Sequence, residues 1–481
     1  MEADNTGGRN IAVVTVGAVA GQLILIAAMP VLTRLYSPDE IGQYSALVAV
    51  LGLLTTIVCL HYELAIPLPK SDRIARRAAW VAMFAALALS GVVLMVLWLV
   101  AAPAVATLVG LGVEAVLWMI PACLVINGIG NVLMAWAIRV RAYNGLAASR
   151  AALGAGQAIP QLAAGFLGFG VSGLAVSQIL GPAAAAAALA PAASSGSSGR
   201  WSLERDWRRL YAVARRYRKF PLITTWSSLI NAIGAQLPVL ALAPLFGPFV
   251  TGQFALAYRL LQVPLRLVGQ SMSQVYLGSI AAGRANNDMT ERTWQLLRFL
   301  AALGIPSFGV LGVVAPELFV VVFGDEWEQA GEFGRLLVPW LLMSFVATVM
   351  SPLVSVLQQQ GRELGYQLLY AVTAIGALLL GAVADSPMVA VTLLGAIGAL
   401  AIAAKVIWLA RSVAIPVGRV LRLFAGEIAR FAPLAIGLVA LSQGVQSELL
   451  LLAAAAFGFA VIHWWNFRFR RIYTLNHVVR S

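Results

Sequence analysis

The chain has 481 residues, of which 60% are hydrophobic and only 11% are charged, and its formal net charge is +13. This balance excludes a soluble globular protein, in which about a quarter of the residues are charged. The positive charge would suit a nucleic-acid-binding protein, but its distribution along the chain excludes that class as well.

Fourteen apolar runs of about 20 residues follow one another, and each is long enough to cross the ~30 Å hydrocarbon core of a bilayer as a helix. We interpret the first as a retained helix, because its apolar run is too long for a signal peptide. The polar residues before it include only one basic side chain, Arg9. Gly and Pro interrupt the fifth run, and the count would be twelve if the close final pair were re-entrant. The predicted spans are 11–32, 41–60, 78–101, 115–138, 150–168, 171–191, 220–243, 250–276, 297–323, 334–357, 364–384, 387–410, 424–442 and 448–466.

The turn after the first span recurs later in the chain. LYSP and GQY at 35–44 return as LFGP and GQF at 245–254, with the Pro, the Gly, the Gln and both aromatic positions at the same spacing. In each copy the turn joins two apolar runs, so the repeated unit is a helix–turn–helix of a membrane bundle. Two similar membrane halves repeated in the same sense are typical of alternating-access transporters.

Basic residues gather in alternate loops, whereas the intervening loops contain almost none, only Arg34 and Arg335. This is the positive-inside pattern, and it predicts that both termini lie in the cytoplasm. The charge is therefore an orientation signal, with some attraction to anionic lipid headgroups. The basic loops contain Lys70, Arg73, Arg76 and Arg77; Arg139, Arg141 and Arg150; the segment 200–219; Arg284, Arg292 and Arg298; Arg362; Arg411, Arg419, Arg422 and Arg430; and Arg468, Arg470 and Arg471.

The longest segment outside the predicted spans, 193–219, begins with a flexible SSGSSG stretch and continues with arginines interleaved with Trp207, Leu210, Tyr211 and Val213. At helical spacing this predicts an amphipathic helix on the cytoplasmic membrane surface. It lies where a linker between the two halves is expected. We therefore predict an N-lobe at 1–192 (spans 1–6), this linker at 193–219, a C-lobe at 220–411 (spans 7–12) and two appended spans with a basic tail at 412–481.

Polar residues inside predicted spans are the candidates for substrate binding, because a charge within the bilayer is costly and usually faces a cavity or a partner. Arg259 and Arg266 in span 8 are seven residues apart, so they share a helix face about 10 Å apart along the axis. Pro264 between them can kink the helix. The candidate substrate-binding residues are Arg259, Arg266, Gln262, Gln270 and Gln274 in span 8, Asn127 and Asn131 in span 4, Gln157 and Gln161 in span 5, and Asn231 and Gln236 in span 7.

Acidic residues are expected to be absent from the middle of the spans, and Glu63 and Glu317 come closest. An exporter of cationic drugs would need carboxylates in its cavity. Arginines predict an anionic ligand instead, and their planar fork suits phosphate. Together with amides and hydroxyls, they favour a diphosphate attached to sugars.

Catalytic and metal-binding patterns are not found. The chain contains no Walker loop, no H-E-x-x-H and no nucleophile elbow, and its three histidines lie at or beyond span ends. Cys59 and Cys123 lie inside apolar runs and are interpreted as packing residues. The sequence therefore predicts a protein that is not an enzyme and needs no cofactor or metal.

Several segments resemble the bacterial oligosaccharide flippases, the Wzx-type polysaccharide biosynthesis proteins of the multidrug/oligosaccharidyl-lipid/polysaccharide exporter superfamily. The resemblance covers most of spans 1–12. One departure is His61, where many relatives carry Arg. The matching segments are PVLTRLYSPDEIG at 30–42, HYELAIPLP at 61–69, RLLQVP at 259–264, and FGDEW at 323–327 followed by Ala330 and Gly331.

The resemblance implies an all-α integral membrane protein with about 14 transmembrane helices. They would form two pseudo-symmetric six-helix lobes, arranged in a V as in the multidrug exporters of the superfamily, plus two C-terminal helices. It also implies a substrate, undecaprenyl diphosphate bearing an O-antigen or exopolysaccharide repeat unit, moved from the cytoplasmic to the periplasmic leaflet of the bacterial inner membrane. Expected partners are membrane lipids, a polysaccharide polymerase and a chain-length regulator, and no nucleic acid.

Two other functions are retained as alternatives. A peptidoglycan-precursor flippase of the same superfamily also binds a diphosphate. A drug or cation antiporter is disfavoured by the missing acidic residues. The sequence leaves open which glycan is carried, what drives transport, the oligomeric state, and whether spans 13 and 14 are needed.

Overall fold

A computed structural model of the chain describes residues 2–194, 206–286, 289–444 and 448–470. These residues form helices joined by short turns, and no β-strand occurs among them, as predicted for an all-α membrane protein. By internal contacts the chain forms two compact units, Met1–Gly252 and Gln253–Ser481. The boundary lies within a helix and not in the linker at 193–219, so the predicted division into lobes stays a prediction.

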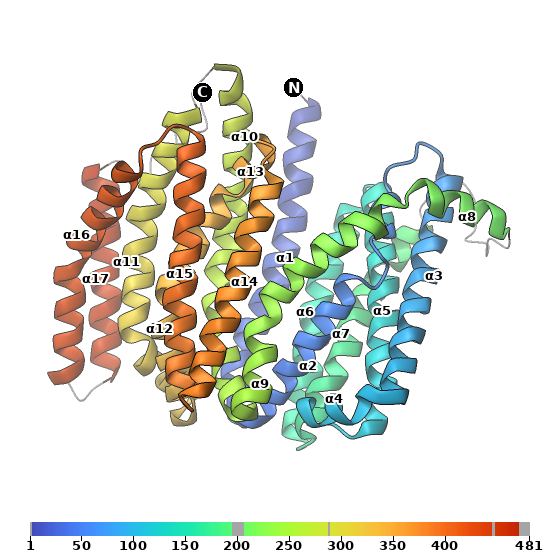
Figure 1. The fold of residues 1–481 in the computed structure, drawn as a ribbon, viewed down its shortest axis with the longest axis horizontal. Helices are drawn as coiled ribbons and strands as arrows, with labels where there is room; N and C mark the ends of the chain where they lie inside the picture. The colour runs from blue at the N-terminus through green and yellow to red at the C-terminus, as the bar shows by residue number, and fades with distance from the viewer. Residues whose placement is uncertain (1, 195–205, 287–288, 445–447, 471–481) are drawn as a thin grey trace. The chain divides into compact units, whose positions relative to one another are not determined.

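The first unit is built around a row of long helices that pack side by side: α3 on α5, α5 on α7, α7 on α6 and α6 on α1 (Figure 1). Its core contains many alanines, which permit close approach of the helices, and larger aliphatic residues that fill the remaining space. Its elements are α1 (Glu2–Leu35), α2 (Pro38–Thr56), η1 (Tyr62–Ala65), α3 (Asp72–Val96), η2 (Leu97–Ala101), α4 (Ala102–Val109), α5 (Val113–Arg139), α6 (Tyr143–Phe166), α7 (Gly170–Ser194), α8 (Trp207–Arg216), η3 (Phe220–Thr224) and most of α9 (Thr225–Leu261).

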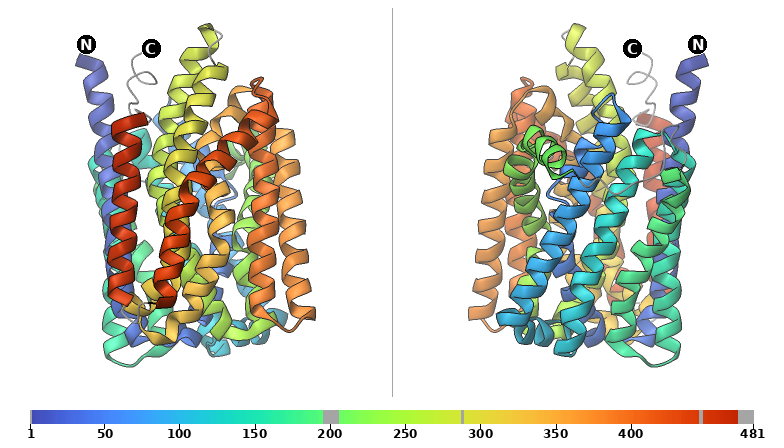
Figure 2. Two further views of the ribbon diagram at one scale, coloured as in Figure 1. Left: turned by 90° about the vertical axis from the view of Figure 1, so that its left-hand side faces the viewer. Right: turned by 90° about the vertical axis from the view of Figure 1, so that its right-hand side faces the viewer.

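The second unit packs α12 between α11 and α15, and α14 lies on α15. The last two helices, α16 and α17, lie against α11 (Figure 1, Figure 2). After the end of α9, its elements are η4 (Leu265–Gly269), α10 (Gln270–Asn286), α11 (Met289–Phe323), η5 (Asp325–Trp327), α12 (Glu328–Met350), α13 (Pro352–Val356), α14 (Gln360–Val383), α15 (Pro387–Ser412), α16 (Val417–Gly444) and α17 (Glu448–Arg470).

Ten described segments are long and apolar enough to cross a membrane. The remaining predicted spans are also helical: 41–60 corresponds to α2, 150–168 to α6 and 448–466 to α17. The predicted spans 220–243 and 250–276 fall on α9 and α10, and one continuous apolar segment, Phe220–Leu261, covers the first of them and part of the second. A count of fourteen therefore stays a prediction, whereas a multi-pass helical membrane protein is what the structure describes.

The structure gives a physical reason for the repeated turn at 35–44 and 245–254. Gly247 leaves the helical region (φ 82°, ψ 177°), so α9 is two helices, and Pro248 begins the second as Pro38 begins α2. The two copies cross within the first unit. A Cβ added to Gly42 would lie 1.8 Å from the Pro248 carbonyl oxygen, and one added to Gly252 would lie 1.9 Å from the Pro38 carbonyl oxygen. Only glycine fits at either position, which accounts for its recurrence.

The glutamine after each glycine contacts a different turn. Gln43 lies against Gly110, the αL residue that ends α4 (φ 66°). Gln253 donates a hydrogen bond from Nε2 to the Glu326 carbonyl oxygen (2.5 Å) and accepts one at Oε1 from the Ala330 backbone N–H (2.9 Å). The repeated Gly-Gln pair thus combines a close backbone crossing with a contact to a later turn of the chain.

The linker helix is only partly as predicted. α8 is amphipathic and is capped by Asp206, whose Oδ1 accepts hydrogen bonds from the Arg208 and Arg209 backbone N–H groups (3.1 and 3.3 Å). However, its apolar residues Leu210 and Val213 are buried in the core of the first unit. The apolar side of this helix therefore covers protein, and its position on the cytoplasmic membrane surface stays a prediction. The serine- and glycine-rich stretch before it lies outside the described residues.

Candidate functional site

The polar stretch predicted in span 8 lies where the helix is interrupted. Pro264 lacks a backbone N–H and its ring crowds the preceding turn. Accordingly, α9 ends at Leu261 and the π-helical turn η4 separates it from α10. Arg259, Gln270 and Gln274 are exposed and Gln262 is half-buried. The backbone of Arg266 lies in η4, but its side chain is outside the described residues.

An aromatic stack holds the helix that carries Arg259. Tyr258 stacks on Phe254 (ring centroids 5.5 Å apart) and on Trp340 of α12 (5.4 Å), and Trp340 stacks in turn on Tyr370 of α14 (5.9 Å). Because Tyr258 is fixed in this way, its neighbour Arg259 is displayed on the adjacent, accessible face of α9. A guanidinium on a rigid helix, next to a break lined with amides, can bind an oxyanion bidentately.

The amides predicted in the first unit have different surroundings. Asn127 donates from Nδ2 to the Cys123 carbonyl oxygen of its own helix (2.8 Å). Gln157 packs over Gly181 of α7, and the amide of Gln236 lies against Gly52 of α2. Asn131 is half-buried and Asn231 is exposed. These side chains lie in the first unit, whereas Arg259, Gln262, Gln270 and Gln274 lie in the second, so convergence of the two groups on one ligand stays a prediction.

Gln161 belongs to a packing network. It is only 1% exposed, and its Nε2 donates to Tyr44 Oη (2.8 Å) and Ser177 Oγ (2.9 Å). Its backbone carbonyl oxygen accepts a hydrogen bond from Tyr36 Oη (2.7 Å), and Gln178 Nε2 donates to Tyr44 Oη (2.5 Å). With both amide hydrogens engaged between α2, α6 and α7, this residue ties three helices together, and we do not retain it as a ligand.

Sequence reasoning missed a charged pair in the second unit. Lys405 Nζ of α15 donates to Glu363 Oε1 of α14 (2.5 Å), and their side chains are 17% and 18% exposed. Glu427 of α16, 5% exposed, pairs with Arg430 (2.6 Å). The expectation that no acidic residue lies in the middle of a span therefore needs correction for Glu427, which lies well inside the candidate span Val417–Ser442. Glu363 lies near the start of its span, Gln360–Val383. Lys405, charged within the predicted span 387–410, was the available signal.

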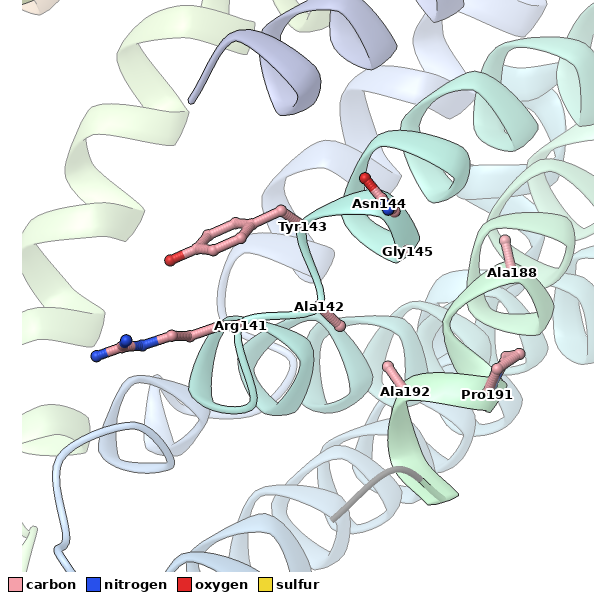
Figure 3. Close-up of a pocket in the computed structure, with 8 residues that line it drawn as sticks. All are labelled: Arg141, Ala142, Tyr143, Asn144, Gly145, Ala188, Pro191 and Ala192. Atoms are coloured by element: carbon pink, nitrogen blue, oxygen red, sulfur yellow. The ribbon is translucent and has the colours of Figure 1, made fainter. Parts of the chain in front are cut away.

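A cavity of about 300 Å³ lies where the α5–α6 turn meets the end of α7 (Figure 3). Arg141 adopts a left-handed backbone conformation (φ 58°), and the Tyr143 backbone N–H donates to its carbonyl oxygen (2.9 Å). In Figure 3 this tight turn sends the Arg141 and Tyr143 side chains to the same side. Sequence reasoning had assigned Arg141 only to orientation. The cavity is lined by Arg141, Ala142, Tyr143, Asn144, Gly145, Ala188, Pro191 and Ala192.

The turn between α2 and α3 holds two titratable groups. Leu60 and His61 both have positive φ (48° and 59°), and His61 Nδ1 lies 3.4 Å from Thr225 Oγ1. Burial lowers the pKa of His61 and raises the pKa of Glu63, whose Oε2 is buried without a hydrogen-bond partner. Arg139 stabilises this turn by pairing with Asp72 (2.7 Å) and donating to the carbonyl oxygens of Ile66 and Pro69 (3.3 and 2.6 Å).

Among the described residues, no cluster of three or more His, Cys, Asp or Glu side chains could hold a metal ion. The exposed stretch of α9, η4 and α10 offers the guanidinium of Arg259, the amides of Gln262, Gln270 and Gln274, and the hydroxyls of Ser271 and Ser273. These groups suit recognition of an anionic, hydroxyl-rich headgroup.

Comparison with known sequences gives two matches. A family model described as polysaccharide biosynthesis protein matches residues 31–332. The teichuronic acid biosynthesis protein TuaB of Bacillus subtilis (strain 168) is 23% identical over 163 residues, which is 32% of this chain and 33% of that protein. The chain thus matches about a third of the length of this curated relative.

The fold is also found in solved structures, including a lipid II flippase and a multidrug transporter. The lipid II flippase MurJ, in an inward closed conformation, superposes with a TM-score of 0.72 at 10% sequence identity, covering 96% of this chain and 99% of that one. An inward-facing multidrug resistance MATE family transporter of the MOP superfamily superposes with a TM-score of 0.56 at 18% identity, covering 84% and 98%. At such identities the likeness is one of fold.

Proposed function

Because this chain belongs to the polysaccharide biosynthesis protein family and has the fold of the MOP superfamily, we propose that it is a flippase for a lipid-linked oligosaccharide. The substrate would be a repeat unit on undecaprenyl diphosphate, destined for O-antigen or exopolysaccharide. It would move from the cytoplasmic to the periplasmic leaflet of the bacterial inner membrane, with both termini of the chain in the cytoplasm. A polymerase and a chain-length regulator would then use the product.

The observation that carries this proposal is the exposed polar stretch at the break between α9 and α10. It places Arg259 with Gln262, Gln270 and Gln274 in an otherwise apolar helical bundle. The guanidinium, joined by Arg266, would bind the diphosphate by bidentate hydrogen bonds, and the amides would contact sugar hydroxyls. Asn127, Asn131, Gln157, Asn231 and Gln236 would contribute from the first unit, and alternating access would move the headgroup while the polyprenyl tail stays in lipid.

The acidic residues found within spans do not favour a drug or cation antiporter. Glu363 and Glu427 are each paired with a cationic side chain, so their charges are already compensated. A peptidoglycan-precursor flippase would show the same fold, but the family match is to polysaccharide biosynthesis proteins and the likeness to the lipid II flippase is at 10% identity. The polysaccharide substrate is therefore the better supported one.

Substitution of Arg259 tests the proposed site. In a strain lacking the native gene, Arg259→Ala should abolish surface glycan at normal membrane levels of the protein, and lipid-linked repeat units should accumulate on the inner leaflet. Arg259→Lys, which keeps the charge but loses the fork, should restore glycan only partly. Arg335→Ala is the matched control, since Arg335 is exposed and paired with Glu332 on the same helix. A normal amount of surface glycan in the Arg259→Ala strain would refute the site. In a separate experiment, loss of viability on deletion of the gene would favour a peptidoglycan precursor as the substrate.

A further inference from the structure

Helix α8 is fixed to the first unit by its inner side. Leu210 and Val213 are 3% and 7% exposed, and Tyr62 Oη donates to the Ala214 carbonyl oxygen (3.4 Å). On one flank of the helix, the ring of Trp207 contacts Phe84 of α3 (centroids 5.2 Å apart) and still remains largely exposed. The position of α8 on the first unit is therefore set by protein contacts, and its other side is exposed.

That other side is basic and aromatic. At 100° per residue, Arg208 and Arg215 lie opposite the buried Leu210 and Val213. Trp207 and Tyr211, which are 67% and 68% exposed, lie along one flank. Arg216 lies along the other flank and is exposed. We call this set the outer face of α8: Trp207, Arg208, Tyr211, Arg215 and Arg216.

Within the described part of the chain, no acidic side chain compensates the charges of the outer face. The nearby carboxylate, Asp206, caps the helix and pairs with Arg209 (2.7 Å). Among the described residues, no ion pair joins Arg208, Arg215 or Arg216 to a carboxylate. Arg218 and Lys219 follow directly in the chain and are also exposed. The surface thus combines a high positive charge with two interfacial aromatic rings.

An exposed apolar surface follows the helix in the chain. Leu222 and Ile223 of η3 are each 64% exposed, and Trp226 at the start of α9 is 61% exposed. The chain therefore passes from a basic face to an apolar one within about one turn and a half of helix, which is the polarity gradient from a phospholipid headgroup to its acyl chains.

We propose that the outer face of α8 binds the phosphate groups of anionic phospholipids in the adjoining leaflet. Arginines suit this role because their fork binds phosphate oxygens bidentately. Trp and Tyr are enriched at the depth where headgroups meet hydrocarbon. A polybasic segment gains about 1 kcal/mol, a factor of about five in affinity, for each basic residue near an anionic surface. The lipid would hold the segment that connects the two predicted lobes at the membrane surface.

The test uses the purified full-length protein with phosphatidylglycerol and phosphatidylcholine as probes. Wild type should prefer phosphatidylglycerol, measured by native mass spectrometry or by binding to nanodiscs of each lipid. The triple variant Arg208→Gln, Arg215→Gln, Arg216→Gln should bind phosphatidylglycerol about 100-fold more weakly, from three losses of about fivefold each. Equal binding of both lipids by wild type would overturn the proposal.

Matched variants distinguish this surface from a general effect of charge. The control Arg362→Gln, Arg411→Gln, Arg422→Gln removes the same charge from exposed positions elsewhere. It should keep the preference, whereas an equal loss would show unspecific attraction and refute the site. The triple Arg→Lys variant on α8 should bind more tightly than the triple Gln variant but more weakly than wild type, because Lys keeps the charge and loses the fork. Displacement of the lipid by millimolar inorganic phosphate would identify a soluble anion as the occupant and also contradict the proposal.

Discussion

At the scale of single residues, burial decides the chemistry of Glu63. Its Oε2 is buried without a hydrogen-bond partner in the turn between α2 and α3, and burial raises the pKa of its carboxyl group. An ionised Glu63 is therefore a cost to the folded state. That cost is absent below the unfolded pKa of 4.5 and grows as the pH rises through the raised pKa of the folded state.

Glu63→Gln should consequently stabilise the protein in a pH-dependent way. At pH 8 the variant should melt at a higher temperature than wild type, and the difference should vanish as the pH falls to about 4.5. Thermal unfolding in detergent across this range measures it. The lowered pKa of His61 affects both proteins alike and cancels in the comparison. Glu114→Gln is the control, because Glu114 is exposed at the start of α5; a pH-independent difference for Glu63→Gln would contradict the argument.

Residue identity alone could not separate ligands from packing residues. Gln157 and Gln161 share a spacing that predicts one helix face, yet both amide hydrogens of Gln161 are hydrogen-bonded to residues of α2 and α7. Nothing in its sequence context signals this, because its partners Tyr44 and Ser177 come from other helices. Arg259 differs, since a charge within an apolar run is costly wherever it lies and so stands out without tertiary information.

At the scale of elements, the repeated turn is the strongest sequence signal and the structure supplies its reason. Pro38 and Pro248 begin helices, and Gly42 and Gly252 let those helices cross at backbone contact. The repeat could be predicted from spacing alone. The crossing could not, because a glycine in a turn is usually explained by its own backbone conformation.

A methyl group at Gly42 or Gly252, where α2 and α9 cross, should therefore disrupt the contact between these helices. Gly42→Ala or Gly252→Ala would place a Cβ within 2 Å of a carbonyl oxygen, so α2 and α9 must separate. We expect each variant to lose surface glycan or to melt at a markedly lower temperature than wild type. Gly91→Ala and Gly234→Ala are the controls, because nothing lies within 4 Å of a Cβ at either position. Equal tolerance of all four substitutions would show that the helices do not cross this closely.

The amphipathic pattern of helix α8 has two structural interpretations. An amphipathic period predicts one buried side but does not identify what covers it. In α8 the cover is α3 and the core of the first unit, and the basic side is left exposed. Both a protein and a membrane surface satisfy the same pattern, so only tertiary contacts could decide between them.

At the scale of the whole molecule, the apolar runs predicted the all-helical membrane fold, because a bilayer permits little else for runs of this length. Hydropathy predicted the location of the ten described segments that are long and apolar enough to cross a membrane. A binding site shared between two units depends on how they face each other, and no local pattern encodes that. The two copies of the repeat differ at the candidate site. Arg259 and Gln262 of the second copy align with Ala49 and Gly52 of the first.

The most direct test of the central claim is transbilayer movement of the substrate by the purified protein. Proteoliposomes would contain undecaprenyl diphosphate bearing the native repeat unit, and a membrane-impermeant glycosidase would report the fraction that is accessible from outside. We predict that wild-type protein makes the inner-leaflet pool accessible and that Arg259→Ala does not. Accessibility equal to that of protein-free liposomes, with wild-type protein folded and correctly inserted, would contradict the account.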